Sequence, residues 1–241
     1  MQAALPISAS REHVRYRRDG AVVTITLDDG KVNALTPRML ADLGAALDRA
    51  GRDGGTVVLG GREGVFSAGF DLGVLRAGGP DAAAMVLAGF AVAERLMAFP
   101  APVVIACSGH AVAMGAFLLL AADHRIGVEG PYTITANEVA IGLTLPHAAI
   151  ELLRHRLQPA AFQQAALLAA PFSPDAAVRA GFLDQLVPPD RLAADAADAA
   201  AEFADRLNPA AHAATKGRVR SEALAALRAA IAADAASIRP S

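Results

Sequence analysis

The chain has no tryptophan and only one cysteine among its 241 residues. A single cysteine excludes an intramolecular disulfide framework, so we expect a fold held by its apolar core in a reducing compartment, the cytoplasm. That cysteine, Cys107, lies in the apolar stretch PVVIACSG. This setting favours a buried, unreactive thiol over a catalytic nucleophile.

Charge of one sign is not in excess, because 22 Lys and Arg residues face 24 Asp and Glu residues. Without a run of basic residues, we do not expect nucleic acid as a partner. Long hydrophobic runs are missing too: AMGAFLLLAA is far shorter than the ~20 residues that cross a bilayer. The N-terminal segment has no basic start followed by an apolar stretch, which argues against export.

Several common catalytic patterns are also missing. The six histidines are scattered, and no pair has a convincing metal-ligand spacing, so we expect no metal. Ser67 lies in GVFSAG, which departs from the G-x-S-x-G pattern of a hydrolase nucleophile. LGGREG does not match G-x-G-x-x-G, which argues against a dinucleotide site.

Strand and helix patterns alternate along the first part of the chain. HVRYRRDG and AVVTITLDDG meet at the turn dipeptide Asp19-Gly20 and predict a hairpin. Thr36 and Pro37 suit the N-cap and the first position of a helix. Further strands are expected at TVVLGG, GVFSAG and PVVIACSG, and a helix over roughly 81–98. This alternation predicts an α/β core with a mostly parallel sheet.

From about residue 147 the pattern is mostly helical. The segment 189–241 is rich in alanine and poor in large apolar side chains, so it is not expected to form a core of its own. We therefore expect a core over 1–188 and a helical region over 189–241. That region would pack against the core or against a neighbouring subunit.

Two glycine-flanked places, Gly69-Phe70 and Ala113-Met114-Gly115, can turn backbone N–H groups toward a cavity. The second opens the apolar helix of GHAVAMGAFLLLAAD. The first N–H groups of a helix lack helical partners and carry the positive end of its dipole. Two such donors can form an oxyanion hole, and simple turns are the alternative interpretation.

Five segments occur in an order that points to a known family. They are KVNAL (31–35), FSAGFDL (66–72), GHAVAMGAFLLLAADHRI (109–126), NEVAIGLTLP (137–146) and AVRAGFLDQLVP (177–188). Over about residues 11–235 the chain resembles the crotonase superfamily, the enoyl-CoA hydratase/isomerase family, and especially its actinobacterial-type members. The resemblance implies a ClpP-like spiral of ββα units with a C-terminal helical trimerisation region, in trimers that usually pair into hexamers.

The resemblance also implies a site for an acyl-CoA thioester, whose carbonyl oxygen accepts the backbone N–H groups of Phe70 and Met114. The residues that would line the CoA passage are Lys31, Val32 and Ala34. Those that would shape the thioester pocket are Ala68, Asp71 and Leu72. Lys216 would meet the adenosine phosphates, with a solvated surface lysine as the alternative. No cofactor is implied, because coenzyme A is part of the substrate.

Hydration in this family resembles a two-glutamate reaction, and here only one glutamate is present. The first family position falls on Phe117 and the second on Glu138. A single carboxylate beside an apolar wall favours Δ3-Δ2-enoyl-CoA isomerisation, with Glu138 as acid and base. The alternatives are a 2-enoyl-CoA hydratase of β-oxidation and a non-catalytic acyl-CoA-binding protein. Asp71 and Asp123 could replace the missing carboxylate, although structural roles at turns are favoured for both.

Overall fold

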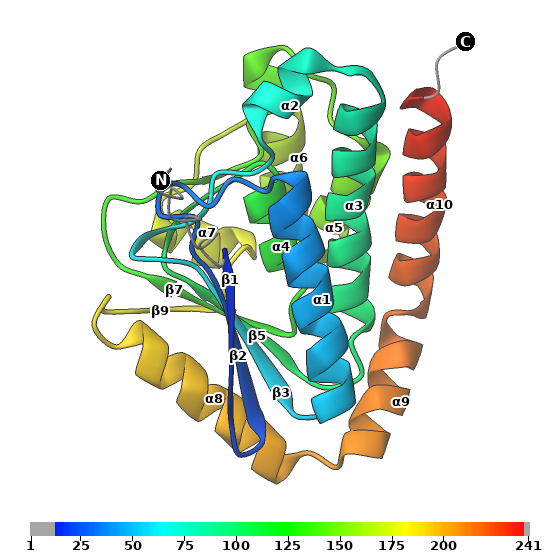
Figure 1. Ribbon diagram of the computed structural model, residues 1–241. Helices are drawn as coiled ribbons and strands as arrows, with labels where there is room; N and C mark the ends of the chain where they lie inside the picture. Colours follow the sequence, from blue (N-terminus) through cyan, green and yellow to red (C-terminus); the bar gives the residue numbers. More distant parts are fainter. Residues whose placement is uncertain (1–12, 239–241) are drawn as a thin grey trace, which may run out of the picture.

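The computed structural model describes residues 13–238 and centres on a six-stranded sheet (Figure 1). The strand order is β1-β2-β3-β5-β7-β9. The strands are β1 (Val14–Asp19), β2 (Val22–Leu27), β3 (Thr56–Gly60), β5 (Val103–Cys107), β7 (His124–Val128) and β9 (Gln185–Val187). The β1–β2 pair is antiparallel and the other pairs are parallel. The predicted hairpin and the mostly parallel sheet are confirmed.

A second sheet of three parallel strands lies beside the ends of the first. It contains β4 (Gly64–Ser67), β6 (Gly109–Val112) and β8 (Ile134–Thr135). We expected residues 109–112 to belong to a turn, and they form a strand instead. The chain bends from β5 into β6 at Gly109, where a Cβ atom would lie 2.1 Å from the Gly64 carbonyl oxygen. Three successive strand pairs therefore repeat one unit, as a spiral of ββα units requires.

Helices cover both faces of the large sheet (Figure 1). α1 (Pro37–Asp53) and α3 (Gly79–Ala98) lie on one face, and α8 (Leu192–Arg206) packs against the central strands from the other. Thr36 caps α1 as predicted, because its hydroxyl accepts the Met39 N–H at 3.0 Å. The short helix α2 (Leu72–Ala77), which the sequence analysis did not anticipate, precedes α3. α4 (Met114–Leu120) is buried along its whole length in the centre of the molecule.

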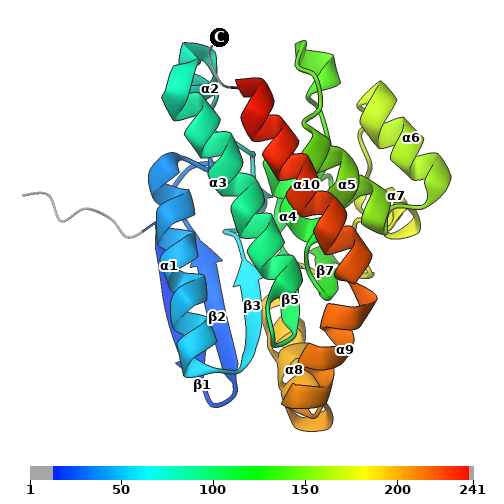
Figure 2. The same ribbon diagram turned by 90° about the vertical axis from the view of Figure 1, so that its right-hand side faces the viewer.

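The rest of the chain is helical apart from β8, β9 and the loops. The remaining helices are η1 (Val139–Ile141), α5 (His147–Arg156), α6 (Pro159–Leu168), α7 (Pro174–Ala180), α9 (Pro209–Val219) and α10 (Ser221–Ile238). α10 runs beside α3 and α5 (Figure 2), so the C-terminal helices pack on the core of their own chain. No helix between residues 13 and 238 is both long and apolar enough to cross a membrane.

The last two helices are separated at Arg220. The Arg220 guanidinium is buried and donates to the carbonyl oxygens of Met97, Ala121 and Ala122 at 2.8, 3.3 and 3.0 Å. Met97 lies in the last turn of α3, and Ala121 and Ala122 directly follow α4 in the chain. One side chain therefore connects the bend between α9 and α10 to the core. The prediction of no export signal falls mainly on residues 1–12, outside the described residues.

Asp234 of α10 closes the N-terminus of α5. Its two carboxylate oxygens accept the N–H groups of His147 and Ala148, each at 2.9 Å, and the residue is only 4 % exposed. A carboxylate at a helix N-terminus is favourable because it satisfies free N–H groups and opposes the helix dipole. This contact joins α10 to the segment that leads into α5.

Replacing Asp234 with alanine should lower the free energy of unfolding by about 2–4 kcal/mol, since two charge-assisted hydrogen bonds are lost. Urea unfolding followed by circular dichroism measures the change. The matched control is Glu222→Ala, an exposed acidic position on the same helix. A loss no larger than that of the control contradicts the proposed capping role.

Candidate active site

Two segments distant in sequence run side by side and position the site. The Ala68 N–H donates to the Val32 carbonyl at 3.0 Å, and the Leu35 N–H donates to the Gly69 carbonyl at 2.8 Å. Buried Asn33, with a positive φ of 53°, donates its side-chain N–H groups to the carbonyls of Leu27 and Phe66. The KVNAL and FSAGFDL motifs are therefore one structural unit.

Ser67 has a structural place in this unit. Its hydroxyl donates to the Asn33 carbonyl at 2.8 Å and accepts the Gly69 N–H at 3.1 Å. The side chain is fully buried. This arrangement supports the interpretation that Ser67 is not a nucleophile, because its hydroxyl is used to hold the loop that follows β4.

The loop after β4 touches the start of α4 through backbone atoms. Gly69 has a φ of +83°, and a Cβ atom there would lie 2.8 Å from the Val112 carbonyl oxygen and 3.3 Å from the Met114 nitrogen. Ala113, which precedes α4, has the unusual positive φ of 50°. Within residues 13–238, neither the Phe70 N–H nor the Met114 N–H donates to another residue. The two predicted oxyanion donors thus lie beside each other with their hydrogen-bonding capacity unused.

A cavity of about 300 Å³ opens next to these donors. Among the predicted site residues, it is lined by Ala68, Phe70, Leu72, Phe117 and Glu138. Leu75, Val86 and Phe90, which the sequence analysis did not select, also line it. The apolar pattern of α2 and α3 gave no signal for these three residues, because a cavity-lining stripe and a core-facing stripe have the same helical spacing.

Glu138 is the acidic residue of this cavity. It is 8 % exposed, and its Oε2 atom is buried without a hydrogen-bond partner among the described residues. Burial raises the pKa of Glu138 from its ordinary value of 4.5 to about 7, because the apolar surroundings disfavour the charged carboxylate. Near neutral pH this carboxyl group can therefore both accept and return a proton.

Phe117 occupies the wall at the position where a second glutamate was expected from the family pattern. Its ring is fully buried and stacks on Phe90, with ring centroids 6.2 Å apart and planes 23° apart. Glu138 is the one titratable side chain among the described residues that line the cavity. The cavity lining at this position is therefore aromatic rather than acidic.

The two candidate replacement carboxylates are committed elsewhere. Asp71 caps α2 by accepting the N–H groups of Gly73 and Val74 at 2.7 and 3.2 Å. Asp123 accepts hydrogen bonds from Lys216 at 2.6 Å and pairs with Arg220 at 2.9 Å. Both carboxylates have the structural roles that the sequence analysis favoured.

The predicted CoA-binding residues fall into two groups in space. Lys31 and Val32 are exposed and Ala34 is half-buried, all on the segment paired with the loop after β4. Lys216 is 7 % exposed, and its ammonium donates to Asp123 and to the Ala101 carbonyl. These partners just precede β7 and β5, at the amino-terminal ends of the parallel strands, whereas Lys31, Val32 and Ala34 follow the carboxyl end of β2. The alternative of a solvated surface lysine is wrong, because Lys216 forms a buried ion pair.

Cys107 is buried, as predicted. Burial raises the pKa of its thiol to about 12, so the reactive thiolate is absent at neutral pH.

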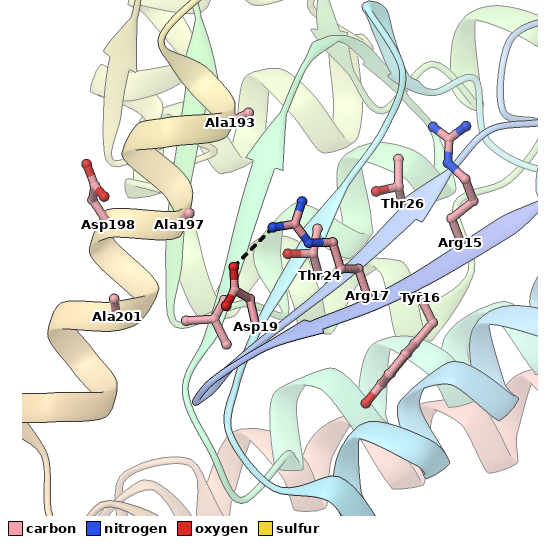
Figure 3. Close-up of a pocket in the computed structure, with 11 residues that line it drawn as sticks. Arg15, Tyr16, Arg17, Asp19, Thr24, Thr26, Ala193, Ala197, Asp198 and Ala201 are labelled. Atoms are coloured by element: carbon pink, nitrogen blue, oxygen red, sulfur yellow. Dashed lines mark hydrogen bonds and ion pairs between the residues drawn. The ribbon is translucent and has the colours of Figure 1, made fainter.

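A larger hollow of about 710 Å³ lies on the other side of the molecule, between the β1–β2 hairpin and α8. Figure 3 shows Arg17 directed toward Asp19 there, with Ala193, Ala197 and Ala201 on the facing helix. None of the predicted site residues lines this hollow. Size alone therefore does not select the candidate active site, and we select the smaller cavity because of its buried carboxylate and the unpaired N–H groups beside it.

Comparison with known proteins shows the family of the chain. The family model described as enoyl-CoA hydratase/isomerase matches residues 17–239, so the chain belongs to that family. A solved Mycobacterium tuberculosis protein, called an enoyl-CoA isomerase in one structure and a probable enoyl-CoA hydratase, EchA3, in another, is 49 % identical, with a TM-score of 0.89 over 93 % of this chain and 98 % of that chain in the first. Human mitochondrial Δ3-Δ2-enoyl-CoA isomerase is 27 % identical, with a TM-score of 0.87, over 94 % and 90 %.

A curated relative carries the other activity in its name. The probable enoyl-CoA hydratase EchA17 of Mycobacterium avium is 30 % identical over 192 residues, which are 78 % of this chain and 73 % of that protein. The structural matches confirm the predicted α/β crotonase fold. The family membership makes the chain an enzyme of the enoyl-CoA hydratase/isomerase class.

Replacing Glu138 with glutamine should stabilise the protein increasingly as the pH rises. The folded pKa of about 7 lies above the ordinary value of 4.5, so wild-type stability is lost as the pH rises through this window. The difference in unfolding free energy between Glu138→Gln and wild type should grow by about 2–3 kcal/mol from pH 5 to pH 8. Urea unfolding at several pH values measures it, and a constant difference would show that Glu138 is not desolvated.

Proposed function

We propose that the protein is a Δ3-Δ2-enoyl-CoA isomerase. The observation that carries this proposal is the single buried carboxylate, Glu138, facing an aromatic wall instead of a second acid. Isomerisation moves one proton between two carbon atoms of the same substrate and therefore needs only one group that accepts and returns it. Hydration must also position and activate a water molecule, and the cavity lining offers no second acid for this, its other polar side chains being Asn137 and Thr144.

In the first step, the thioester carbonyl oxygen of a 3-enoyl-CoA accepts the N–H groups of Phe70 and Met114. These donors withdraw electron density from the carbonyl and make the C2 proton more acidic. The Glu138 carboxylate takes that proton, and the electron pair of the C2–H bond moves toward the carbonyl oxygen to form a dienolate. Aligned donors of this kind stabilise such an oxyanion by about 2.7–4 kcal/mol each.

In the second step, the protonated Glu138 gives its proton to C4. The electron pairs shift so that the C3=C4 double bond becomes C2=C3, and the carbonyl is restored. The proton removed equals the proton returned, so no water, metal or cofactor enters the balance. Phe117 and Phe90 keep water away from the dienolate, which protects the returning proton from exchange.

The alternative reaction is the hydration of a 2-enoyl-CoA. The name of the Mycobacterium avium relative favours it, and the oxyanion donors would serve both reactions. Under that alternative, Glu138 would have to orient the water and deliver the proton alone. The apolar lining around Phe117 supports isomerisation over this arrangement.

We also propose a homotrimer, or a hexamer of two trimers, with subunit contacts that include region 189–241. Leu167 and Leu168 on α6, Val139 on η1 and Val219 on α9 are large, exposed apolar side chains, and a neighbouring subunit would remove them from water. The single, buried cysteine supports the expected cytoplasmic location.

The decisive experiment compares 3-enoyl-CoA and 2-enoyl-CoA as substrates at equal concentration. We expect isomerisation to be the faster reaction, and its kcat to rise with pH as Glu138 ionises near pH 7. Glu138→Gln should lower kcat by roughly 10²–10⁴-fold. The control is Glu63→Gln, an exposed glutamate outside the cavity. Faster hydration by the wild type, or full activity of Glu138→Gln, would overturn the proposal.

Phe117→Glu should introduce measurable hydration of 2-enoyl-CoA, since a second carboxyl group would then face Glu138 across the cavity. Phe117→Leu keeps the wall apolar and should retain isomerase activity without hydration. Circular dichroism confirms folding of both variants before assay. Hydration by the leucine variant at the rate of the glutamate variant would contradict the role assigned to the wall.

A further inference from the structure

The cavity beside Glu138 has an open end and a closed end. Leu72, Ile141 and Leu143 line it while remaining about half exposed, so they mark the end that faces solvent. Phe90 and Phe117 line it while fully buried, so they mark the end inside the protein. The oxyanion donors and Glu138 lie between a surface rim and an aromatic floor.

Packing holds the aromatic floor in place. Phe90 stacks on Phe117, and it also meets Phe70 edge to face, with ring centroids 6.3 Å apart and planes 72° apart. Phe70 in turn lies so close to α3 that a Cβ atom at Gly89 would be 2.4 Å from its ring. α10 packs against the same helix from outside. Because α3 is held on both sides, an acyl chain that reaches Phe90 cannot push the floor aside cheaply.

We propose that Phe90 and Val86 of α3 set the acyl-chain length of the substrate, and that the site takes acyl chains of medium length. This inference rests on the proposed function only for the identity of the thioester. Val86 lies one helical turn before Phe90 and lines the same cavity. The methyl end of the chain meets these two side chains when the thioester carbonyl meets Phe70 and Met114.

The volume of the cavity gives the expected length. At about 30 Å³ for each water-sized group, the space of about 300 Å³ holds about ten such groups. The thioester carbon, oxygen and sulfur use about three of them, which leaves room for about seven further carbon atoms. The best fit is therefore an acyl chain of about eight carbons.

The lining also selects against polar tails. Apart from Glu138 beside the reacting carbons, the described lining residues carry no charge. The other polar side chains of the lining, Asn137 and Thr144, belong to the segment that contains Glu138 and not to α3. A charged tail at Phe90 would therefore lose its hydration without gaining an ion-pair partner. The expected substrates are thus simple aliphatic thioesters.

The test uses saturated acyl-CoAs from butyryl to tetradecanoyl, which bind without reacting, with dissociation constants measured by calorimetry. Each methylene that enters the cavity should tighten binding about fourfold. This gain in affinity per added methylene should stop near eight carbons and be absent beyond about ten. The binding measurement involves no turnover, so it tests the length limit even if the protein proves not to be an isomerase. Conversely, observed isomerase activity does not by itself establish the length limit.

Variants locate the limit on α3. Val86→Ala should increase by about one carbon the chain length at which affinity stops rising. Up to that length, each added methylene should still tighten binding about fourfold. Val92→Ala is the matched control, since Val92 is buried on α3 but does not line this cavity. Phe90→Leu should increase this limiting chain length further, and circular dichroism checks that the variant folds.

Three results would overturn the proposal. One is steady tightening up to tetradecanoyl-CoA in the wild type, which would mean that the chain leaves through the open end. A second is an equal shift for Val86→Ala and Val92→Ala. The third is an unchanged limiting chain length in both Val86→Ala and a folded Phe90→Leu variant.

Discussion

The backbone contact between Gly69 and the start of α4 is the constraint on which the site depends. It requires glycine at two places, because a Cβ atom at Gly69 would strike Val112 and one at Gly115 would lie 2.5 Å from the Ser67 carbonyl oxygen. The parallel pairing of β4 with β6 brings the two strand ends together at this point. As a result, the N–H groups of Phe70 and Met114 lie close together without other partners among the described residues, next to a cavity lined by Phe70 and Ala113.

The chemistry follows from placing one carboxylate in that cavity. Burial disfavours the charged form of Glu138 and raises its pKa to about 7, which makes it a stronger base than a solvated glutamate. The same apolar walls exclude water from the reacting carbons. Phe117 contributes to both effects, since a second carboxylate would bring solvent and a competing charge. An aromatic wall thus favours a proton shuttle over the addition of water.

Local features were predictable where short-range physics decides them. The Asp19-Gly20 hairpin, the Thr36 cap and the burial of Cys107 all depend on neighbouring residues and were confirmed. Two short strands were missed: β6 because its first residue, Gly109, was interpreted as part of a turn, and β9 because three residues are too few to show a strand pattern. The buried Lys216–Asp123 pair joins residues 93 positions apart, and no local signal distinguishes such a lysine from a solvated one.

The sequence by itself determined the family, the α/β alternation and the presence of one glutamate where a hydratase-type pair would have two. Motif order and residue type carry that information directly. Only the tertiary structure decided that Glu138 is desolvated, that the buried rings of Phe90 and Phe117 line the same cavity, and that Lys216 lies at the amino-terminal ends of β5 and β7. These properties arise from side chains on separate elements meeting in space, and a pKa or a cavity floor exists only once that packing has formed.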